Sequence, residues 1–258
     1  MDAKDVILGN YIKELAKEGK REDSRGSMDF RDLKISRGVI DHAEGSAQAD
    51  LGATKVLAGV KLVQEDVYED TPDQGNLVVS AELLPLAAAE YETGPPSPEA
   101  IELGRVVDRA IRAGNCIDLK SLLLEEGKAW TVYVDVYVLN FDGNLFDASV
   151  IAAMSAILDA RVPEYADGKA DYTKREKKLK VDNVVSSTTF AKIGKAILLD
   201  PTGNEELGMD ARLTISTDGK MIRAMQKGLA GSFSVEEIES LIAESLKKHA
   251  HMEKKIRG

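Results

Sequence analysis

Three arginines at helical spacing are the residues of this chain best suited to bind a charged ligand. Arg105 and Arg109 are four residues apart, and Arg112 follows three residues later. The three therefore share one face of a helix expected over residues 97–113. Guanidinium groups arranged in this way can hold successive phosphates through paired hydrogen bonds. The alternative is a solvated face neutralised by acidic neighbours such as Asp108, and the pattern alone favours that alternative.

Carboxylates gather in residues 200–210, a segment expected to be a loop between two strands. Oxygen ligands grouped in this way can hold Mg²⁺, and one of them can serve as a general acid. An acidic surface turn has the same composition, so the cluster by itself leaves both interpretations open. Its members are Asp200, Glu205, Glu206 and Asp210.

The other reactive residue types predict no metal site, no cofactor and no covalent nucleophile. The three histidines, His42, His249 and His251, are too few and too poorly placed for a metal site. His249 and His251 are two apart on an expected helix, so they point to different faces, and both are expected to be solvated. Cys116, the single cysteine, has no activating partner nearby in the sequence and is expected to be a small buried residue. The sequence also lacks a phosphate-binding loop, a dinucleotide fingerprint and a nucleophile elbow.

The composition excludes several classes of protein. The 258 residues include 34 basic and 44 acidic side chains, a net charge of −10. A stand-alone protein that binds nucleic acid through a broad basic surface is therefore excluded. A hydrophobic content of 43% supports a folded core, and one cysteine cannot form an internal disulfide. No apolar run approaches the length of a membrane span, and no signal-peptide pattern is present. We expect a cytoplasmic globular protein without membrane contact.

Four helices are expected from hydrophobic periodicity and end signals. The first covers residues 4–18, and the second begins at Ser97, which can cap it ahead of Pro98. A third is expected to be capped by Asp147. The last begins at Ser234, which forms a capping box with Glu237. Strands are expected over residues 33–38, 54–63, 77–84, 130–138, 193–199, 211–217 and 220–226, with a hairpin turn at Asp218-Gly219.

These elements predict an α+β protein with two related halves, each a sheet backed by helices. Residues 1–24 form an amino-terminal helix and lead-in, and the first half covers residues 25–165. A basic linker over residues 166–180 contains five lysines and arginines between Lys174 and Lys180. The second half covers residues 181–258.

Several segments together resemble the RNase PH family. The run from Glu44 to Leu57 (EGSAQADLGATKVL) resembles its amino-terminal signature, a Gly-Ser pair followed by Gly-x-Thr-x-Val. The charged stretch REDSR, residues 21–25, is similar to the segment that precedes this signature. Farther along, the family pattern matches ILLDPT at 197–202, DARLTI at 210–215 and the Asp218-Gly219 hairpin. The resemblance covers residues 20–250 and implies an RNase PH-type fold with two pseudo-symmetric βαβ-like halves, similar to domain 2 of ribosomal protein S5.

The resemblance also implies that this chain has lost catalysis. Active members degrade RNA from its 3′ end by phosphorolysis and hold phosphate in a Gly-Ser-Arg cradle before a helix. Here that place holds Asn144-Leu145-Phe146, and leucine and phenylalanine side chains cannot donate hydrogen bonds. Active members carry two aspartates after Asp-Pro. Asp210 corresponds to the second, and Glu205 or Glu206 replaces the first.

Within the family the chain is most similar to the non-catalytic type of subunit in the archaeal exosome ring. The resemblance then implies three copies alternating with three catalytic RNase PH-like subunits, RNA-binding cap subunits on one face, and single-stranded RNA as ligand. Arg105 and Arg109 match an Arg-x-x-x-Arg pattern, whose arginines reach across the subunit interface to hold the RNA backbone. The resemblance does not decide whether Arg112 also contacts RNA. Two alternatives remain: an enzyme active by itself, and a structural spacer that never touches RNA.

Overall fold

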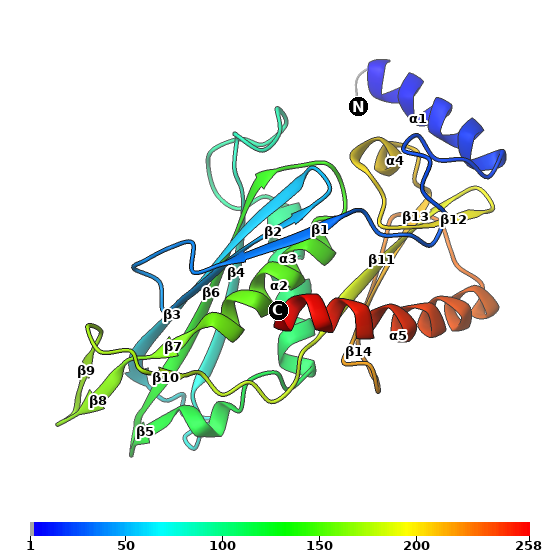
Figure 1. Ribbon diagram of the computed structural model, residues 1–258. Coiled ribbons are helices and arrows are strands. Elements are labelled where there is room, and N and C mark those ends of the chain that lie inside the picture. Colours follow the sequence, from blue (N-terminus) through cyan, green and yellow to red (C-terminus); the bar gives the residue numbers. More distant parts are fainter. Residues whose placement is uncertain (1–2) are drawn as a thin grey trace.

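The structure, a computed structural model, describes residues 3–258 and contains two large β-sheets connected and covered by helices, together with two small two-stranded sheets (Figure 1). Residues 1 and 2, the start of the expected lead-in 1–24, lie outside the described residues. No helix in the described part of the chain combines the length and apolarity needed to cross a membrane.

The first sheet is mixed. Its strands lie in the order β1 (Leu33–Arg37), β2 (Gly45–Leu51), β3 (Thr54–Asp66), β6 (Lys128–Asn140) and β4 (Asn76–Leu83), and β5 (Leu123–Glu125) pairs with the start of β6. Neighbours are antiparallel except β4 and β6, which are parallel and joined through helix α2 (Pro98–Ala113) and the short 3₁₀ helix η1 (Leu119–Leu122). The alternating valines of β6 are buried, and α3 (Leu145–Asp159) packs against this strand, which explains the strong strand pattern of this segment.

The second sheet is wholly antiparallel. Its order is β12 (Ala196–Leu199), β11 (Ser186–Ile193), β13 (Ala211–Thr217) and β14 (Ile222–Gly228). Helix α3 contacts both β11 and the first sheet, so it lies between the two sheets. The first helix, α1 (Ala3–Lys17), packs against the short helix α4 (Gly203–Leu207) at the far end of the second sheet (Figure 1).

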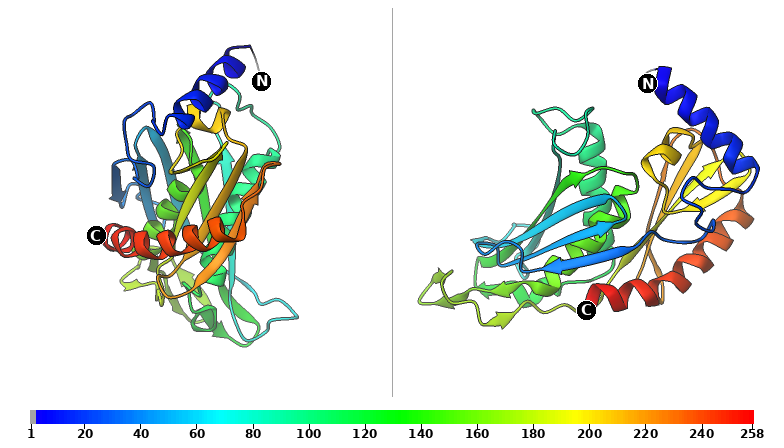
Figure 2. Two further views of the ribbon diagram at one scale, coloured as in Figure 1. Left: turned by 90° about the vertical axis from the view of Figure 1, so that its right-hand side faces the viewer. Right: turned by 45° about the horizontal axis from the view of Figure 1, so that its top comes forward.

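Helix α5 (Val235–Arg257) connects the cores of the two halves. Near its start, Leu241 packs into the core of the second sheet, whereas Met252 and Ile256 pack into the core of the first. Its end is held by Arg37 of β1, which donates a hydrogen bond to the Ile256 carbonyl. Both views in Figure 2 show this helix running from the second sheet to the first.

The expectation of a solvated tail histidine was wrong for His249. Its side chain is only 3% exposed, and Nδ1 shares a hydrogen bond of 2.8 Å with the Ser186 hydroxyl of β11. The long apolar stripe of α5 places this position against the second sheet, which the local sequence around His249 does not show. His251 is exposed, as expected, and His42 is exposed as well.

Three other local expectations were wrong. The strand expected over 193–199 is correct only for β12, since Ile193 ends β11 and the chain turns at Gly194, where φ is +60°, to form a hairpin of the two strands. The loop expected over 200–210 contains α4, stabilised by a capping box between Thr202 and Glu205. Helix α3 is capped by Asn144 instead of Asp147, which lies in its first turn and is completely buried.

The segment expected to link the two halves contains several short strands. β8 (Glu164–Ala166) pairs with β9 (Lys169–Asp171), and β7 (Arg161–Val162) pairs with β10 (Lys177–Lys178). Its basic run is partly neutralised, since Lys174 pairs with Glu164 at 3.2 Å and Lys180 with Asp118 at 3.2 Å. These contacts fix the segment against the first half.

Candidate functional site

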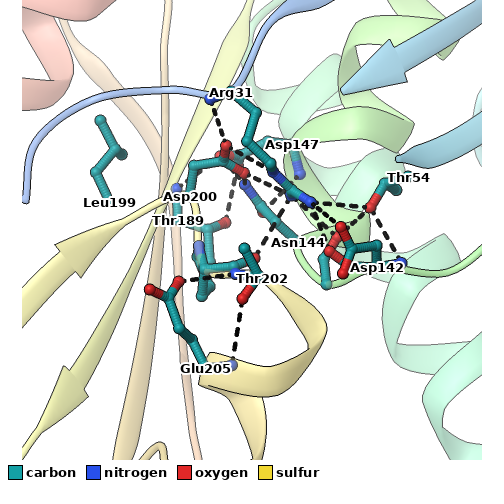
Figure 3. A network of polar contacts seen from close by, with 12 residues as sticks. Arg31, Thr54, Asp142, Asn144, Asp147, Thr189, Leu199, Asp200, Thr202 and Glu205 are labelled. Atoms are coloured by element: carbon teal, nitrogen blue, oxygen red, sulfur yellow. Dashed lines mark hydrogen bonds and ion pairs between the residues drawn. The ribbon is translucent and has the colours of Figure 1, made fainter. Parts of the chain in front are cut away.

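A buried ion pair joins the two halves of the molecule (Figure 3). Arg31 lies just before β1, and Asp200 lies just after β12. The guanidinium of Arg31 donates to both oxygens of Asp200 at 3.0 and 2.8 Å, and its backbone N–H donates at 2.8 Å. Burial alone would raise the pKa of Asp200, but the hydrogen bonds and charge of Arg31 hold it below its usual value. Asp200 is therefore a structural carboxylate that stays ionised.

The first turn of α3 extends this network to β11. The amide of Asn144 donates to Asp200 at 2.6 Å and to Asp147 at 2.9 Å. Asp147 in turn accepts hydrogen bonds from the backbone N–H of Thr189 at 2.9 Å and from its hydroxyl at 2.8 Å. All four residues are buried. Polar side chains from both halves thus satisfy one another at the point where the sheets meet.

Glu205 is also used structurally. Its carboxylate accepts two hydrogen bonds from the Arg21 guanidinium, at 2.8 and 2.6 Å, and both side chains are almost completely buried. Arg21 also donates to the carbonyl groups of Leu199 and Asp200 at 2.9 Å each. The charged stretch before the first sheet therefore anchors the start of α4.

The start of α3, where the resemblance places a phosphate cradle, holds a carboxylate of the chain itself. The backbone N–H of Asn144 donates to Glu206 at 2.8 Å. Burial raises the pKa of Glu206 despite this bond. The next two side chains, Leu145 and Phe146, are apolar, and the Arg212 guanidinium stacks on the Phe146 ring at 4.1 Å. The groups that could bind an anion here are occupied or missing.

An acidic cleft of about 980 Å³ opens beside this point. It lies between the start of α2, the segment from Leu84 to Pro96, and the start of α3. Its apolar lining includes Tyr91 and Phe141, whose ring centroids are 5.9 Å apart. Arg212 is the one basic side chain of the lining, and six glutamates oppose it: Glu82, Glu90, Glu92, Glu99, Glu102 and Glu206. This excess of negative charge repels phosphate.

The structure separates Arg112 from the other two arginines of α2. Arg112 donates to Asp108 at 2.8 and 3.2 Å and to the Leu77 carbonyl at 2.8 Å. Arg105 and Arg109 are exposed, and neither makes an ion pair or hydrogen bond with any described residue. Two guanidinium groups thus remain available on the surface of α2, while the third supports the helix.

The acidic cluster predicted from the sequence is not one site. Asp210 accepts the Gly194 backbone N–H at 2.7 Å and faces Lys13 at 3.4 Å, whereas Glu205 binds Arg21 and Glu206 faces the cleft. Residues 3–258 contain no group of three or more histidine, cysteine or acidic side chains placed to hold a metal ion. Cys116 is fully buried, and burial raises its pKa to about 12, so the thiol is unreactive near neutral pH.

Sequence reasoning missed the polar network that joins the halves. Arg31 lies in a short segment without periodicity, and Thr189 lies in a strand that was not expected. One signal was available in the sequence, because Asp200 directly follows an apolar strand and precedes a proline. A carboxylate that is buried at the end of such a strand needs a basic partner. Nothing in one sequence identifies which arginine supplies that partner.

Replacing Asp147 by asparagine should flatten the dependence of stability on pH. Burial raises the pKa of Asp147 from 3.8 to about 7. The folded state therefore holds a proton that the unfolded chain has released, and stability falls as the pH rises from about 4 to 7, by roughly 1.4 kcal/mol per pH unit. An asparagine side chain keeps an oxygen that can accept a hydrogen bond from Thr189, but it does not titrate in this pH range. Urea unfolding at pH 5 and pH 8 measures the difference.

Asp218→Asn is the matched control for this pH experiment. Burial favours a higher pKa, but Arg223 and nearby backbone N–H groups lower the pKa of Asp218 to about 2. This carboxyl is ionised in both states from pH 5 to 8, so its replacement lowers stability without changing the slope. An Asp147→Asn variant that keeps the full slope of the parent protein would contradict the assignment.

Comparisons with known proteins agree with the fold and cover nearly the whole chain. The profile described as "3′ exoribonuclease family, domain 1" matches residues 29–163, and the profile of domain 2 matches residues 183–248. The protein "Exosome complex component Rrp42" of Thermococcus gammatolerans is 44% identical over 254 residues, 96% of this chain and 93% of the relative. The Rrp42 protein of Thermoplasma acidophilum is 44% identical over 243 residues, 93% of this chain and 91% of its own.

Solved structures show the same similarity. A chain of the Archaeoglobus fulgidus exosome "with RNA bound to the active site" superposes with a TM-score of 0.92 at 38% identity, over 98% of this chain and 99% of that one. A chain of an "Archaeal exosome core" gives a TM-score of 0.88 at 34% identity over the full length of both.

Proposed function

The chain belongs to the 3′ exoribonuclease family, the RNase PH family, and we propose that it is a non-catalytic, RNA-contacting ring subunit of an exosome. The expected α+β fold of the RNase PH type is confirmed by the family match and by the superposed exosome chains. In this proposal, catalytic subunits of related fold alternate with this chain in a six-membered ring that degrades RNA by phosphorolysis. Cap subunits bind one face of the ring.

The observation that carries the non-catalytic role is the hydrogen bond from the Asn144 N–H to Glu206. Phosphorolysis requires inorganic phosphate to bind and attack, so its site must stabilise an anion. The Glu206 side chain occupies the backbone N–H that phosphate would need, and Leu145 and Phe146 add no donor. The excess of glutamates in the neighbouring cleft adds repulsion of phosphate.

The second element of the proposal is RNA contact through Arg105 and Arg109. Both guanidinium groups are exposed on α2 and lack partners in the described chain. Unpaired arginines can approach phosphate without first breaking an ion pair. The net charge of −10 is consistent with this role, because a ring needs only a few cations directed at its RNA path.

The organisation and location of the protein complete the proposal. We divide the chain into a lead-in of residues 1–24, halves at 25–165 and 181–258, and a connecting segment at 166–180. The matched family domains lie within those two halves. We place the complex in the cytoplasm, which fits an RNA-degrading assembly built from chains like this one, whose described part has no membrane-spanning helix.

Phosphorolysis assays with the isolated chain and with the reconstituted ring test this function. The chain alone, supplied with RNA and phosphate, should release no nucleoside diphosphate, whereas the ring with its catalytic partner should release it processively. Diphosphate release by the isolated chain would contradict the proposal. A Glu206→Gln variant of the isolated chain should also be inactive, because neutralising one carboxylate does not restore the missing donors.

The alternative of an independent enzyme is poorly supported by the geometry. It requires Glu205 or Glu206 to act together with Asp210. Glu205 is held by Arg21, whereas Asp210 lies just before β13, where it accepts a hydrogen bond from the Gly194 N–H and faces Lys13. The other alternative, a spacer without RNA contact, is separated from the proposal by the behaviour of the α2 arginines.

A further inference from the structure

A second pocket, of about 860 Å³ and of opposite charge to the acidic cleft, lies in the first half of the molecule. Residues of β5, the start of β6 and the paired strands β7 and β10 line this basic pocket, and Figure 1 shows these strands at the end of the molecule away from the second sheet. The acidic cleft lies at the other end of β6. Four lysines and two glutamates line the basic pocket, whereas one arginine and six glutamates line the cleft. The basic pocket therefore attracts anions although the whole chain is acidic.

Two of the four lysines are free to meet an anion. Lys174 and Lys180 each pair with a carboxylate at 3.2 Å, so their charges are compensated within the chain. Lys177 and Lys178 are exposed, and neither side chain makes an ion pair or hydrogen bond with a described residue. Glu176 is the one carboxylate of the lining without such a partner. A free ammonium group can approach phosphate without first breaking an ion pair.

The wall that carries the two free lysines is fixed by the fold. β10 pairs with β7 in the first half. Directly after it, the Leu179 N–H donates to the Ala160 carbonyl at 2.9 Å, and the Leu179 side chain is buried in the first core. Just before it, the Arg175 guanidinium donates to the Ala43 carbonyl at 2.7 Å. A ligand thus meets a wall that is already ordered, which reduces the entropy lost on binding.

The floor of the basic pocket is apolar and aromatic. Trp130 packs edge-on against Tyr165, with ring centroids 6.5 Å apart, and leucine side chains complete the floor. Burial, together with the Glu125 carboxylate nearby, raises the pKa of the Tyr165 hydroxyl, which therefore keeps its proton as a donor. This hydroxyl is buried and has no hydrogen-bond partner among the described residues. The floor therefore contains a donor that the chain itself leaves unsatisfied.

A nucleotide matches both parts of the basic pocket. Its phosphate carries the charge that Lys177 and Lys178 attract, and its base offers apolar faces to the floor. Acceptor atoms at the edge of the base can receive the Tyr165 hydroxyl. An acidic peptide matches the rim alone, because a carboxylate placed on the apolar floor would lose its hydration without a charged partner.

We infer that the basic pocket between β5, β6, β7 and β10 binds single-stranded RNA, with phosphates at Lys177 and Lys178 and a base on the floor beside Tyr165. Neither Arg105 nor Arg109 lines this pocket, so it is a second RNA site. The inference goes beyond the proposed function and does not require the ring.

The test measures binding of a fluorescent hexa-adenylate to the full chain at low salt. The background is Arg105→Ala/Arg109→Ala, in which α2 cannot contribute. Adding Lys177→Gln/Lys178→Gln should weaken binding about tenfold or more, and should lower the logarithmic salt slope by about 1.4, because two phosphates lose their contacts.

Two further variants make the test specific. Lys195→Gln/Lys220→Gln is the matched control: it removes two exposed lysines, unpaired among the described residues, from hairpin turns of the second sheet and should change neither quantity. Tyr165→Phe should weaken binding about fivefold without changing the salt slope, because it removes a hydrogen bond and no charge. Urea unfolding should show no loss of stability in Tyr165→Phe, since the hydroxyl has no partner within the described chain.

The outcomes separate this inference from the proposed function. Absence of hexa-adenylate binding by the background chain would overturn the RNA site, as would unchanged affinity in the Lys177/Lys178 variant or in Tyr165→Phe. Equal or tighter binding of hexaglutamate would assign the basic pocket to an acidic peptide and would also overturn the RNA site. Each of these results leaves the proposed ring subunit intact. Nucleoside diphosphate release by the isolated chain would instead overturn the proposed function and leave the basic pocket in place.

Discussion

The variant Arg105→Ala/Arg109→Ala should reduce the affinity of the assembled ring for single-stranded RNA about a hundredfold or more. Each hydrogen bond between charged groups contributes about 1.5–3 kcal/mol, and about 1.4 kcal/mol corresponds to a factor of ten. Neither arginine has a partner in the described chain, so alanine removes the contact without freeing a buried carboxylate. The dependence of RNA affinity on salt should also weaken by about 1.4 in the logarithmic slope, since two phosphates are released from contact.

Arg112→Ala is the matched control on the same helix. Arg112 is exposed, but it is engaged by Asp108 and by the Leu77 carbonyl. Its replacement should change RNA affinity by less than about threefold and lower the stability of the chain slightly, as expected for a surface ion pair. A double variant that binds RNA with the affinity and salt dependence of the parent would favour a purely structural spacer.

The variant Arg31→Met should lower the free energy of unfolding by about 3 kcal/mol, because it removes the main counter-charge of the buried Asp200 and leaves only the single ion pair with Arg25 at 3.1 Å. Asp200 is completely buried, so water cannot replace the guanidinium. Adding Asp200→Asn should recover part of the loss, since the neutral amide costs less to bury than an isolated carboxylate. Chemical unfolding of the two single variants and the double variant, arranged as a cycle, measures this coupling.

A surface pair provides the comparison for this cycle. Lys128 and Asp66 lie 2.5 Å apart, but their side chains are 41% and 80% exposed. Replacing Lys128 by methionine should cost less than about 1 kcal/mol, because water solvates the remaining carboxylate. Equal losses for Arg31→Met and Lys128→Met would mean that the junction between the halves contributes little to stability.

Elements with a strong periodic pattern were predictable from the sequence. The strand β6 follows from its alternating valines, and the starts of α2 and α5 follow from local capping rules. Ser97 caps the start of α2, and Ser234 forms a capping box with Glu237 at the start of α5. The parallel pairing of β4 with β6 follows from none of these signals, because it depends on how α2 crosses the sheet.

β11 shows why other elements were missed. Four consecutive hydroxyl residues, Ser186 to Thr189, give it the composition of a loop, yet all four are buried. Three of them are satisfied by partners distant in sequence: Ser186 by His249, Ser187 by Ser216, and Thr189 by Asp147. Local pattern rules assign polar residues to the surface, so a strand stabilised by long-range hydrogen bonds is not visible to them.

The site was predictable in part for a similar reason. The residues at 144–146 and the exposed arginines of α2 occupy positions that the family resemblance identifies. The carboxylate of Glu206 at the start of α3 is a contact between residues 62 positions apart in the chain, and the excess of charge in the cleft arises from four separate segments. Neither follows from the spacing of residues in the sequence.

Helix α5 has a geometric consequence for any closed ring built from this chain. A ring of six members closes only if the wedge angles of its members sum to a full turn, so a small angular error in each is added up around the circle. Leu241 and Ile256 anchor α5, a continuous helix about 35 Å long, in the cores of both halves. A hinge movement between the halves would have to pull one of these side chains out of its core. The wedge angle is thus set within each chain before the ring assembles.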